Sequence, residues 1–382
     1  MKKSLAILLT LALLFSLAAC GGGGGTPAAT KAPEVTTAPD APETTDAPPV
    51  ETEDASAGDP ADYFSVLKAD ESRESPEAVQ ANEAYTIGVL LPMLSNAHFT
   101  AQAYGYVSEA EALGVEAIVW DCGGYANFDT QVRQMEDLIT MGVDGIILVA
   151  ADADACVNPI NAAFEAGIPV INVNVMANSD NVLKIKSDDT AIGEMEAERI
   201  ATLLGGEGKV LMVRGTAGTS WAIGRGDGFK AYMEANYPGI EILDELWCAN
   251  EVDAAMLQVE DAIMAYGDDI QAVYAPGENT GKGAILALKA AGMIDNVPVV
   301  ACDPSDDSIS MILEGSMKAS VVQYSVGLGQ WGVRAMVNIL NGNADQLSKQ
   351  YWTTLEIVDA DNVNTFEFVG FSKAPADWQL AS

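Results

Sequence analysis

Residues 143–174 of this chain read VDGIILVAADADACVNPINAAFEAGIPVINVN. Two apolar runs, VDGIILVA (143–150) and IPVINVN (168–174), flank an amphipathic stretch at about 155–166. Near-continuous apolar strands are typical of parallel sheets covered on both faces, because neither face of such a strand meets water. The stretch therefore predicts a strand, a helix and a second, parallel strand.

The same alternation extends over most of the chain from Tyr85 onward. The other apolar runs are TIGVLLP (86–92), VEAIVWD (115–121), GKVLMVRG (208–215), IEILDELW (240–247), IQAVYA (270–275), VPVVACD (297–303) and ASVVQ (319–323). Between the runs we expect helices at 99–113, 128–141, 189–204, 222–236, 253–266, 279–291, 305–315 and 326–341. Strands that alternate with helices predict an α/β, doubly wound architecture.

The number of runs indicates two lobes. Four strand–helix units precede about residue 187 and five strand-like runs follow it, so two similar lobes fit better than one large sheet. The length of 382 residues agrees, since single hydrophobic cores rarely grow beyond about 250 to 300 residues. The final stretch, 351–371, has an alternating and aromatic character and is expected to add strands across the junction.

The first twenty residues carry a targeting signal. Two lysines precede an apolar run at 5–17, which is too short for a membrane span and typical of a secretory signal. The residues LAAC (17–20) resemble the lipobox of bacterial lipoproteins, which implies a signal peptide at 1–20 and lipid on Cys20 of the mature protein. The alternative is an ordinary signal peptide with an incidental cysteine. Acyl chains would anchor the extracytoplasmic protein to the bacterial cell membrane, at its outer face or in the periplasm, with about 0.8 kcal/mol for each buried CH₂.

Residues 21–84 are expected to form a disordered tether. From residue 21 to about residue 58 the sequence consists of five glycines followed mainly by Thr, Ala, Pro, Glu and Asp. Such a composition buries too little apolar surface to offset the ordering of its backbone. A few larger apolar side chains at 63–67 are compatible with a short helix near the end of this segment.

Composition excludes several classes of function. The chain has 19 Lys and Arg against 55 Asp and Glu, so its surface should repel nucleic acids. The remaining cysteines form no CxxC motif and no cluster with histidine, and we expect them to be free and buried, with no metal and no cofactor; they are Cys122, Cys156, Cys248 and Cys302. A single histidine, no HExxH motif and GTSWA (218–222) in place of a GxSxG elbow argue against an enzyme.

Polar and aromatic residues follow many of the predicted strands. Ligands of open parallel sheets bind beyond the carboxyl ends of the strands, where these side chains should gather. Planar polar groups can span neighbouring hydroxyls while aromatic faces cover the C–H side of a sugar ring, so we predict a site for a neutral polyhydroxyl ligand. The predicted site residues are Asn96, His98, Phe99, Asn174, Trp221, Arg225, Asn250, Glu278, Asn279, Asp303 and Gln323.

Single members of this set have simpler explanations. Asp303 could be the N-cap of a helix and Asn96 could hold a turn. Trp221 could be an ordinary core or rim aromatic. The joint pattern over many strand ends carries the prediction.

The chain resembles the sugar-binding proteins of ABC importers in the periplasmic-binding-protein type I superfamily, and the ribose-binding type in particular. The resemblance runs from about residue 85 to about residue 358. The motifs that carry it are TIGVLLPMLSNAHF, MGVDGIILVAADADA, AGIPVINVN, SDDTAIGEMEAERIA, GTAGTSWAIGRGDGF, IQAVYAPGENTGKGAILALKAAG, VPVVACDPSDD and MKASVVQYSVGLGQWGVRAM.

The resemblance implies roles for individual residues. Asn96 would bind a hydroxyl and Phe99 would stack on a ring, while Arg225, Asp303 and Gln323 would supply the polar contacts of the second lobe and the hinge. The departures from the ribose-binding type argue against ribose itself and favour another pentose, a hexose, a polyol or a modified sugar. They are Pro92 for a serine, His98 for a stacking Phe, Asn174-Val175 for an Asp-Arg pair and Gly277 for an Asn.

The resemblance also implies a mechanism. A ligand held between two lobes would stabilise their closed state, and the closed, monomeric protein would then dock on a membrane permease. A sensory subunit that presents a sugar-like signal to a membrane receptor, or a binder of nucleosides or other solutes, would use the same cleft. The implied crossovers lie near Ser187-Asp188, Gln323-Tyr324 and Trp352 to Leu355, with lobes at 85–187 plus 325–352 and 188–324 plus 353–372.

The stretch GTAGTSWAIGRGDGF (215–229) allows three interpretations: a phosphate-binding glycine run, an Arg-Gly-Asp adhesion tripeptide, or an arginine aimed at a ligand. It lacks the GxGxxG spacing and the acidic partner of a dinucleotide site. We expect Arg225 in the first turn of a helix at the cleft, with Trp221 beside it and the glycines letting the helix begin close to the ligand.

Overall fold

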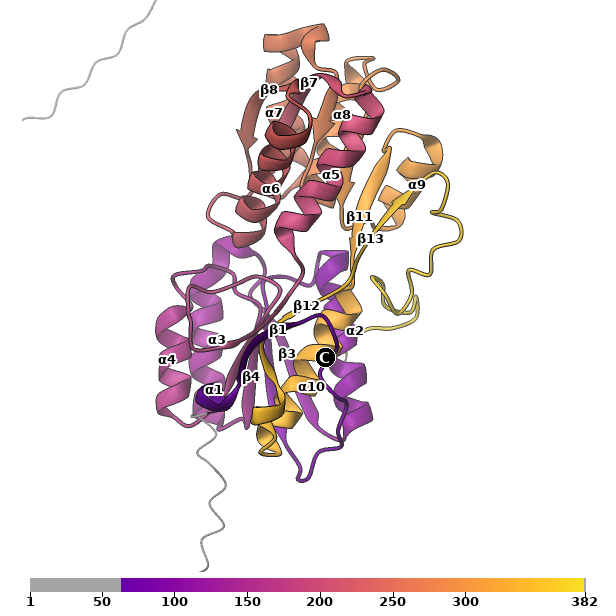
Figure 1. Ribbon diagram of the computed structural model, residues 1–382. Coiled ribbons are helices and arrows are strands. Elements are labelled where there is room, and N and C mark those ends of the chain that lie inside the picture. Colours follow the sequence, from indigo (N-terminus) through magenta and orange to yellow (C-terminus); the bar gives the residue numbers. More distant parts are fainter. Residues whose placement is uncertain (1–62, 381–382) are drawn as a thin grey trace, which may run out of the picture. The chain divides into compact units, whose positions relative to one another are not determined.

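The computed structural model describes residues 63–380 (Figure 1). These residues lie within the unit Ala55–Ser382, and residues 1–54 lie outside the described residues. The predicted signal peptide, Cys20 and the predicted tether up to residue 62 lie outside them as well. Between residues 63 and 380, no helix is both long enough and apolar enough to cross a membrane.

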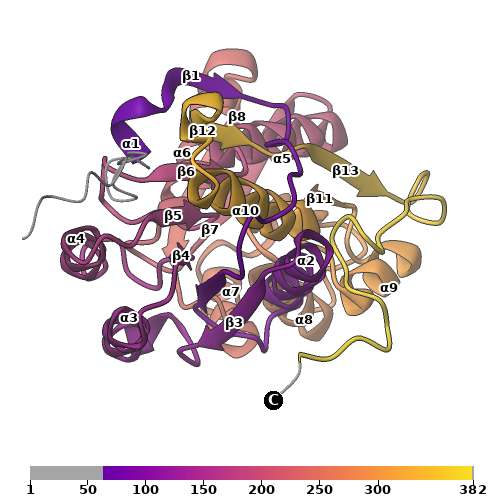
Figure 2. The ribbon, with the colours of Figure 1, turned by 90° about the horizontal axis from the view of Figure 1, so that it is seen from below.

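The first sheet has seven strands in the order β1-β12-β6-β5-β4-β2-β3, and all neighbouring strands are parallel. Helices cover both of its faces, with α2 and α10 on one and α3 and α4 on the other (Figure 2). The elements are α1 (Tyr63–Val66), β1 (Lys68–Ser72), β2 (Thr86–Leu91), α2 (Ala97–Leu113), β3 (Glu116–Asp121), α3 (Phe128–Met141), β4 (Gly145–Leu148), α4 (Val157–Glu165), β5 (Val170–Val173), β6 (Leu183–Lys186), α10 (Ser325–Leu340) and β12 (Ser348–Trp352).

The second sheet has six strands in the order β13-β11-β10-β9-β7-β8, of which only β13 is antiparallel to its neighbour. Helices α5 and α6 cover one face, and α7 and α8 the other. The elements are α5 (Asp189–Leu204), β7 (Glu207–Gly215), α6 (Ser220–Asn236), β8 (Gly239–Trp247), α7 (Val252–Tyr266), β9 (Ala272–Tyr274), α8 (Glu278–Ala290), β10 (Val299–Cys302), α9 (Asp306–Glu314), β11 (Ala319–Gln323) and β13 (Leu355–Asp359).

The predicted fold class is confirmed: two doubly wound, mainly parallel sheets are joined by three crossovers. The chain passes between the sheets from β6 to α5, from β11 to α10 and from β12 to β13, at the predicted places. A hydrogen bond of 3.0 Å between the hydroxyls of Ser187 and Thr353 joins two of these crossings. All strands of the two sheets except β1 fall within the predicted lobe boundaries, which stay a prediction.

Residues 63–84 differ from the predicted disordered tether. They contain α1 and β1, and β1 pairs in parallel with β12 at the edge of the first sheet. The sequence of β1, KADES, has no apolar run, and the strand is mostly exposed. Backbone pairing and polar contacts hold it in place instead of burial. The indole N–H of Trp352 donates to Glu71 at 2.7 Å, and Arg73 lies 3.4 Å from Asp188 at the first crossover.

Strand β6 was also missed from the sequence. It alternates two buried apolar residues with two lysines, so it lacks the continuous apolar run of its neighbours. Beyond β13, residues 360–380 form no further strand, apart from an isolated bridge between Val369 and Lys373. The prediction of added strands at 351–371 therefore holds only for its first part.

Glycines set the distance between the two helices that cover one face of the second sheet. An added Cβ at Gly193 of α5 would lie 1.9 Å from the backbone oxygen of Arg225 in α6, and one at Gly228 would lie 2.5 Å from that of Thr190. The backbones of α5 and α6 are therefore in direct contact. This contact fixes the position of the Arg225 backbone relative to α5.

Replacing Gly193 should loosen this contact. We expect Gly193→Val to lower the free energy of unfolding by about 1–3 kcal/mol, because overpacked side chains push the two backbones apart. Chemical denaturation followed by circular dichroism measures the change. Glu194→Val, at an exposed neighbouring position of the same helix, is the control for the lower helix propensity of valine. Equal losses in the two variants would contradict the proposed role of Gly193.

Candidate functional site

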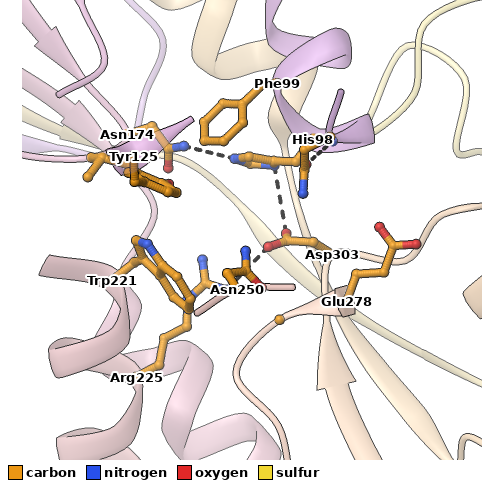
Figure 3. Close-up of a pocket in the computed structure, with 12 residues that line it drawn as sticks. His98, Phe99, Tyr125, Asn174, Trp221, Arg225, Asn250, Glu278 and Asp303 are labelled. Atoms are coloured by element: carbon orange, nitrogen blue, oxygen red, sulfur yellow. Dashed lines mark hydrogen bonds and ion pairs between the residues drawn. The ribbon is translucent and has the colours of Figure 1, made fainter. Parts of the chain in front are cut away.

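A cavity lies between the carboxyl ends of the strands of the two sheets (Figure 3). Its free volume is about 30 Å³, which is room for one or two water molecules, so a larger ligand requires the lining side chains to separate. The lining residues are Asn96, His98, Phe99, Tyr125, Asn174, Val175, Trp221, Arg225, Asn250, Gly277, Glu278 and Asp303.

Arg225 is the central charge of the second-sheet side. Its side chain is only 5% exposed, and its Nε donates to Asp189 Oδ1 at 3.0 Å. Nη1 donates to the backbone oxygen of Pro276 at 2.6 Å and to Asp303 Oδ2 at 3.2 Å. The guanidinium also lies 5.3 Å from the centre of the Trp221 ring, within the range of a cation–π contact. These contacts fix the group in one orientation.

Two carboxylates therefore share one buried guanidinium. Burial acts to raise the pKa of Asp303, but the charges of His98 and Arg225 and the amide of Gln323 together lower it. Burial raises the pKa of Asp189, and the charge of Arg225 offsets this only in part. Asp303 thus stays ionised at neutral pH and can accept hydrogen bonds from a ligand.

The first-sheet side is made by the start of α2 and the end of β5. The side chain of Asn96 caps α2 by accepting the backbone N–H of His98 at 2.8 Å. The His98 ring lies 2.8 Å from the amide nitrogen of Asn174, and its centre lies 5.3 Å from that of Phe99. Phe99 and Tyr125 add aromatic surface to the same wall, with ring centres 6.3 Å apart.

Backbone strain is concentrated in this site. Between residues 63 and 380, Asn174 and Asp303 are the non-glycine residues with positive φ, at 62° and 63°. Asn and Asp tolerate this left-handed conformation better than other side chains, and strained residues cluster at ligand sites. One such residue ends a strand of each sheet, so each sheet aims a polar side chain at the cavity.

A family model described as a periplasmic binding protein domain matches residues 87–344. The chain belongs to this family. The xylitol-binding protein of Mycolicibacterium smegmatis is 32% identical over 250 residues, which cover 63% of this chain and 70% of that protein. The ribose import binding protein of Salmonella typhimurium is 29% identical over 274 residues, 72% of this chain and 90% of that protein.

Solved structures agree with this assignment. The substrate-binding protein of a sugar ABC transport system from Bordetella parapertussis has a TM-score of 0.73 at 25% identity, over 80% of this chain and 98% of that one. An ABC transporter solute-binding protein from Bacillus halodurans, with bound myo-inositol, has a TM-score of 0.67 at 27% identity, over 75% of this chain and 97% of that one.

In this periplasmic binding protein, most of the predicted site residues line the cavity, and their part in ligand binding stays a prediction. The two that do not line it support others that do. Gln323 donates to Asp303 Oδ1 at 2.7 Å, and Asn279 donates to the backbone oxygen of Asn250 at 3.0 Å. The nine in the cavity are Asn96, His98, Phe99, Asn174, Trp221, Arg225, Asn250, Glu278 and Asp303.

Three lining residues were not among the predicted set: Tyr125, Val175 and Gly277. Tyr125 follows β3 in a short 3₁₀ turn, Tyr125–Asn127, so the rule of strand ends would have found it if applied to the second apolar run. Glu278 was predicted from its position alone. Its carboxylate lies 3.3 Å from Lys282, four residues along the same helix, and 3.4 Å from Ser308; only the contact with Ser308 depends on the tertiary structure.

The structure also distinguishes between the three interpretations of the glycine-rich stretch at 215–229. Arg225 lies in the second turn of α6 rather than in the first, and its burial excludes recognition of the Arg-Gly-Asp tripeptide by another protein in this conformation. None of these glycines lines the cavity, but an added Cβ at Gly215 would lie 2.6 Å from the ring of Trp221, which does, and the predicted role of the glycines stays a prediction. An added Cβ at Gly224 would lie 2.9 Å from Asp189, and one at Gly226 would lie 2.4 Å from the guanidinium of Arg214. Gly224 and Gly226 therefore serve the packing of α6.

The four cysteines within the described residues are free, and all but the half-buried Cys248 are buried. Residues 63–380 contain no group of three or more His, Cys, Asp or Glu side chains that could hold a metal ion.

Glu196 is a buried acid behind Arg225. Its side chain is fully buried, and within residues 63–380 neither carboxyl oxygen has a partner at good hydrogen-bond geometry, although the buried Tyr274 hydroxyl is near enough to lower the pKa of Glu196. Burial raises its pKa well above the usual 4.5, and Arg225 offsets this only in part. The native state therefore holds Glu196 as a neutral acid under conditions in which the unfolded chain would ionise it.

Glu196→Gln should stabilise the protein, more so at high pH. A raised native pKa means that wild-type stability falls as the pH rises above 4.5, by about 1.4 kcal/mol per pH unit until the native pKa is reached. Glutamine lacks this penalty, so the gain in the free energy of unfolding should grow from pH 5 to pH 8. Denaturation at several pH values measures it, with Glu194→Gln as the exposed control. A gain that does not change with pH would show that Glu196 is ionised in the native state.

Proposed function

We propose that this chain is an extracytoplasmic, lipid-anchored binding protein that captures a neutral sugar or polyol between its two sheets and delivers it to an ABC transporter permease. The observation that carries the proposal is the pair of Arg225 and Asp303, buried at the cavity with donors and acceptors fixed. Charged groups in fixed orientations bind vicinal hydroxyls strongly, and rigid groups lose little entropy on binding.

The aromatic residues of the cavity support a ligand with C–H faces. Phe99, Tyr125 and Trp221 come from both sides of the cavity. A sugar or polyol offers alternating hydroxyl edges and apolar C–H surface, which matches this mixture. The named ligands of similar proteins, xylitol, ribose and myo-inositol, share that chemistry.

The crossovers support the proposal that the protein closes by a hinge. Three chain segments join the sheets, and the ligand would contact both, so its binding would favour the closed arrangement. A permease could then distinguish the loaded protein from the empty one. Lipid on Cys20 would keep the protein close to that permease.

A ligand screen tests the function. We expect a pentose other than ribose, a hexose, a polyol or a modified sugar to raise the melting temperature, because a ligand at 100 times its dissociation constant adds about 2.7 kcal/mol of stability. Differential scanning fluorimetry of the purified protein against pentoses, hexoses, alditols, cyclitols and nucleosides measures this. A response to nucleosides alone would overturn the proposal.

Arg225→Ala should weaken binding of the identified ligand by about 2–3 kcal/mol, since it removes a charged hydrogen-bonding group. Isothermal titration calorimetry gives the dissociation constant. Lys230→Ala removes a basic group of the same helix that pairs with Glu245 outside the cavity, and should leave binding unchanged. If Arg225→Ala does not fold because two carboxylates lose their partner, Arg225→Lys keeps the charge and should still bind more weakly. An unchanged dissociation constant in a folded variant would show that Arg225 does not bind the ligand.

A further inference from the structure

His98 is held on both sides by neighbouring residues. Its side chain is only 7% exposed, at the start of α2. Nε2 lies 2.8 Å from the amide nitrogen of Asn174, and Nδ1 lies 2.7 Å from the hydroxyl of Ser325. Nδ1 is also 3.7 Å from Asp303 Oδ1, on the opposite side of the cavity (Figure 3). Both ring nitrogens are thus occupied without a ligand.

Two contacts decide which nitrogen carries the proton. The hydroxyl of Ser325 also lies 3.3 Å from the backbone oxygen of Gln323, which can only accept, so Ser325 donates there and accepts from Nδ1–H. The carboxylate of Asp303 on the same side favours a proton on Nδ1 and disfavours a bare lone pair. Nε2 is then an acceptor, and it takes a hydrogen from the amide of Asn174.

The orientation of Asn174 follows from the ring. An amide that donates its nitrogen to Nε2 turns its oxygen the other way, and no group within residues 63–380 donates to that oxygen. Asn174 lines the cavity, so the oxygen is free to meet a ligand. A side chain amide can otherwise present either end, which leaves it unable to discriminate a donor from an acceptor.

We propose that His98 is a positioning residue that fixes Asn174 as a hydrogen-bond acceptor, so that the site selects a ligand hydroxyl that donates at this point. This deepens the proposed function and rests on it. His98 itself makes no hydrogen bond to the ligand, because both of its nitrogens are engaged by the protein.

Protonation of His98 would reverse this polarity. An imidazolium donates from both nitrogens, so Asn174 would have to turn its oxygen to Nε2 and offer its N–H₂ group to the ligand. The charged and polar groups that face the ring are Asp303, Arg225, Asn174 and Ser325. Burial lowers the pKa of His98 from its usual 6.5, with Asp303 and Asn174 opposing and Arg225 adding to the shift. The ring is therefore neutral at pH 7 and switches only in acid.

The tautomer can be measured directly because His98 is the only histidine of the chain. We expect ¹⁵N-histidine NMR of the full protein at pH 7 to show one neutral ring with the proton on Nδ1. A proton on Nε2, or a charged ring at pH 7, would overturn the proposal. The measurement needs no ligand, so its outcome is independent of whether the ligand is a sugar or a polyol.

Asn174→Asp provides a second test. A carboxylate cannot donate to Nε2, so that nitrogen should take up a proton and the pKa of His98 should rise. Asn250→Asp adds the same charge to the same cavity, but Asn250 has no hydrogen bond with the ring, so the Nδ1 tautomer should persist there. An unchanged tautomer in Asn174→Asp would contradict the assigned contact.

The binding readout separates positioning from a purely structural role. With the ligand found by screening, wild-type affinity should hold at neutral pH and fall below the pKa of His98, by at most about tenfold per pH unit, since one proton is linked. His98→Phe should bind more weakly at pH 7 and lose this acid dependence. If the ligand affinity of the wild type depended on pH in the same way as that of His98→Phe, the proposal would be wrong. If no ligand is found, the tautomer still decides the arrangement of Asn174.

Discussion

The guanidinium of Arg225 is the group on which the rest of the site depends. It joins Asp189 at the start of α5, Pro276 after β9 and Asp303 after β10, so one side chain ties together three segments that are distant in sequence. A buried charge of this kind is tolerated only when its partners are in place, since an unpaired charge in the interior costs several kcal/mol. The ends of these segments are therefore fixed relative to one another before any ligand arrives.

Close helix packing makes that arrangement possible. Arg225 can reach both carboxylates only because α6 lies directly against α5, and glycines at the contact remove the side chains that would keep the helices apart. The helices of the first sheet make the same kind of close contact. An added Cβ at Gly105 of α2 would lie 2.2 Å from the backbone oxygen of Val326 in α10. In both halves the helix that carries cavity residues is held by backbone contact with its neighbour. Rigid presentation of polar groups follows from this packing.

The two walls of the cavity use different physical means. The second-sheet wall relies on ionised groups, Arg225 with Asp189 and Asp303. The first-sheet wall relies on neutral hydrogen bonds around His98, which reach the hinge through Ser325. The walls meet where His98 Nδ1 faces Asp303. This contact joins the two sides of the cavity, so the empty site already links the two sheets.

The sequence by itself determined the strands and helices with strong periodicity, the two-sheet architecture and nine of the lining residues, because apolar runs and strand-end positions are local properties. It missed β1, an edge strand that pairs with β12 and has no apolar run, and β6, in which two buried apolar residues alternate with two lysines. The tertiary structure alone decided that Gly224 and Gly226 serve the packing of α6, that Ser308 contacts Glu278, and that His98 orients Asn174. Those facts depend on which segments meet in space, and local sequence patterns do not encode such meetings.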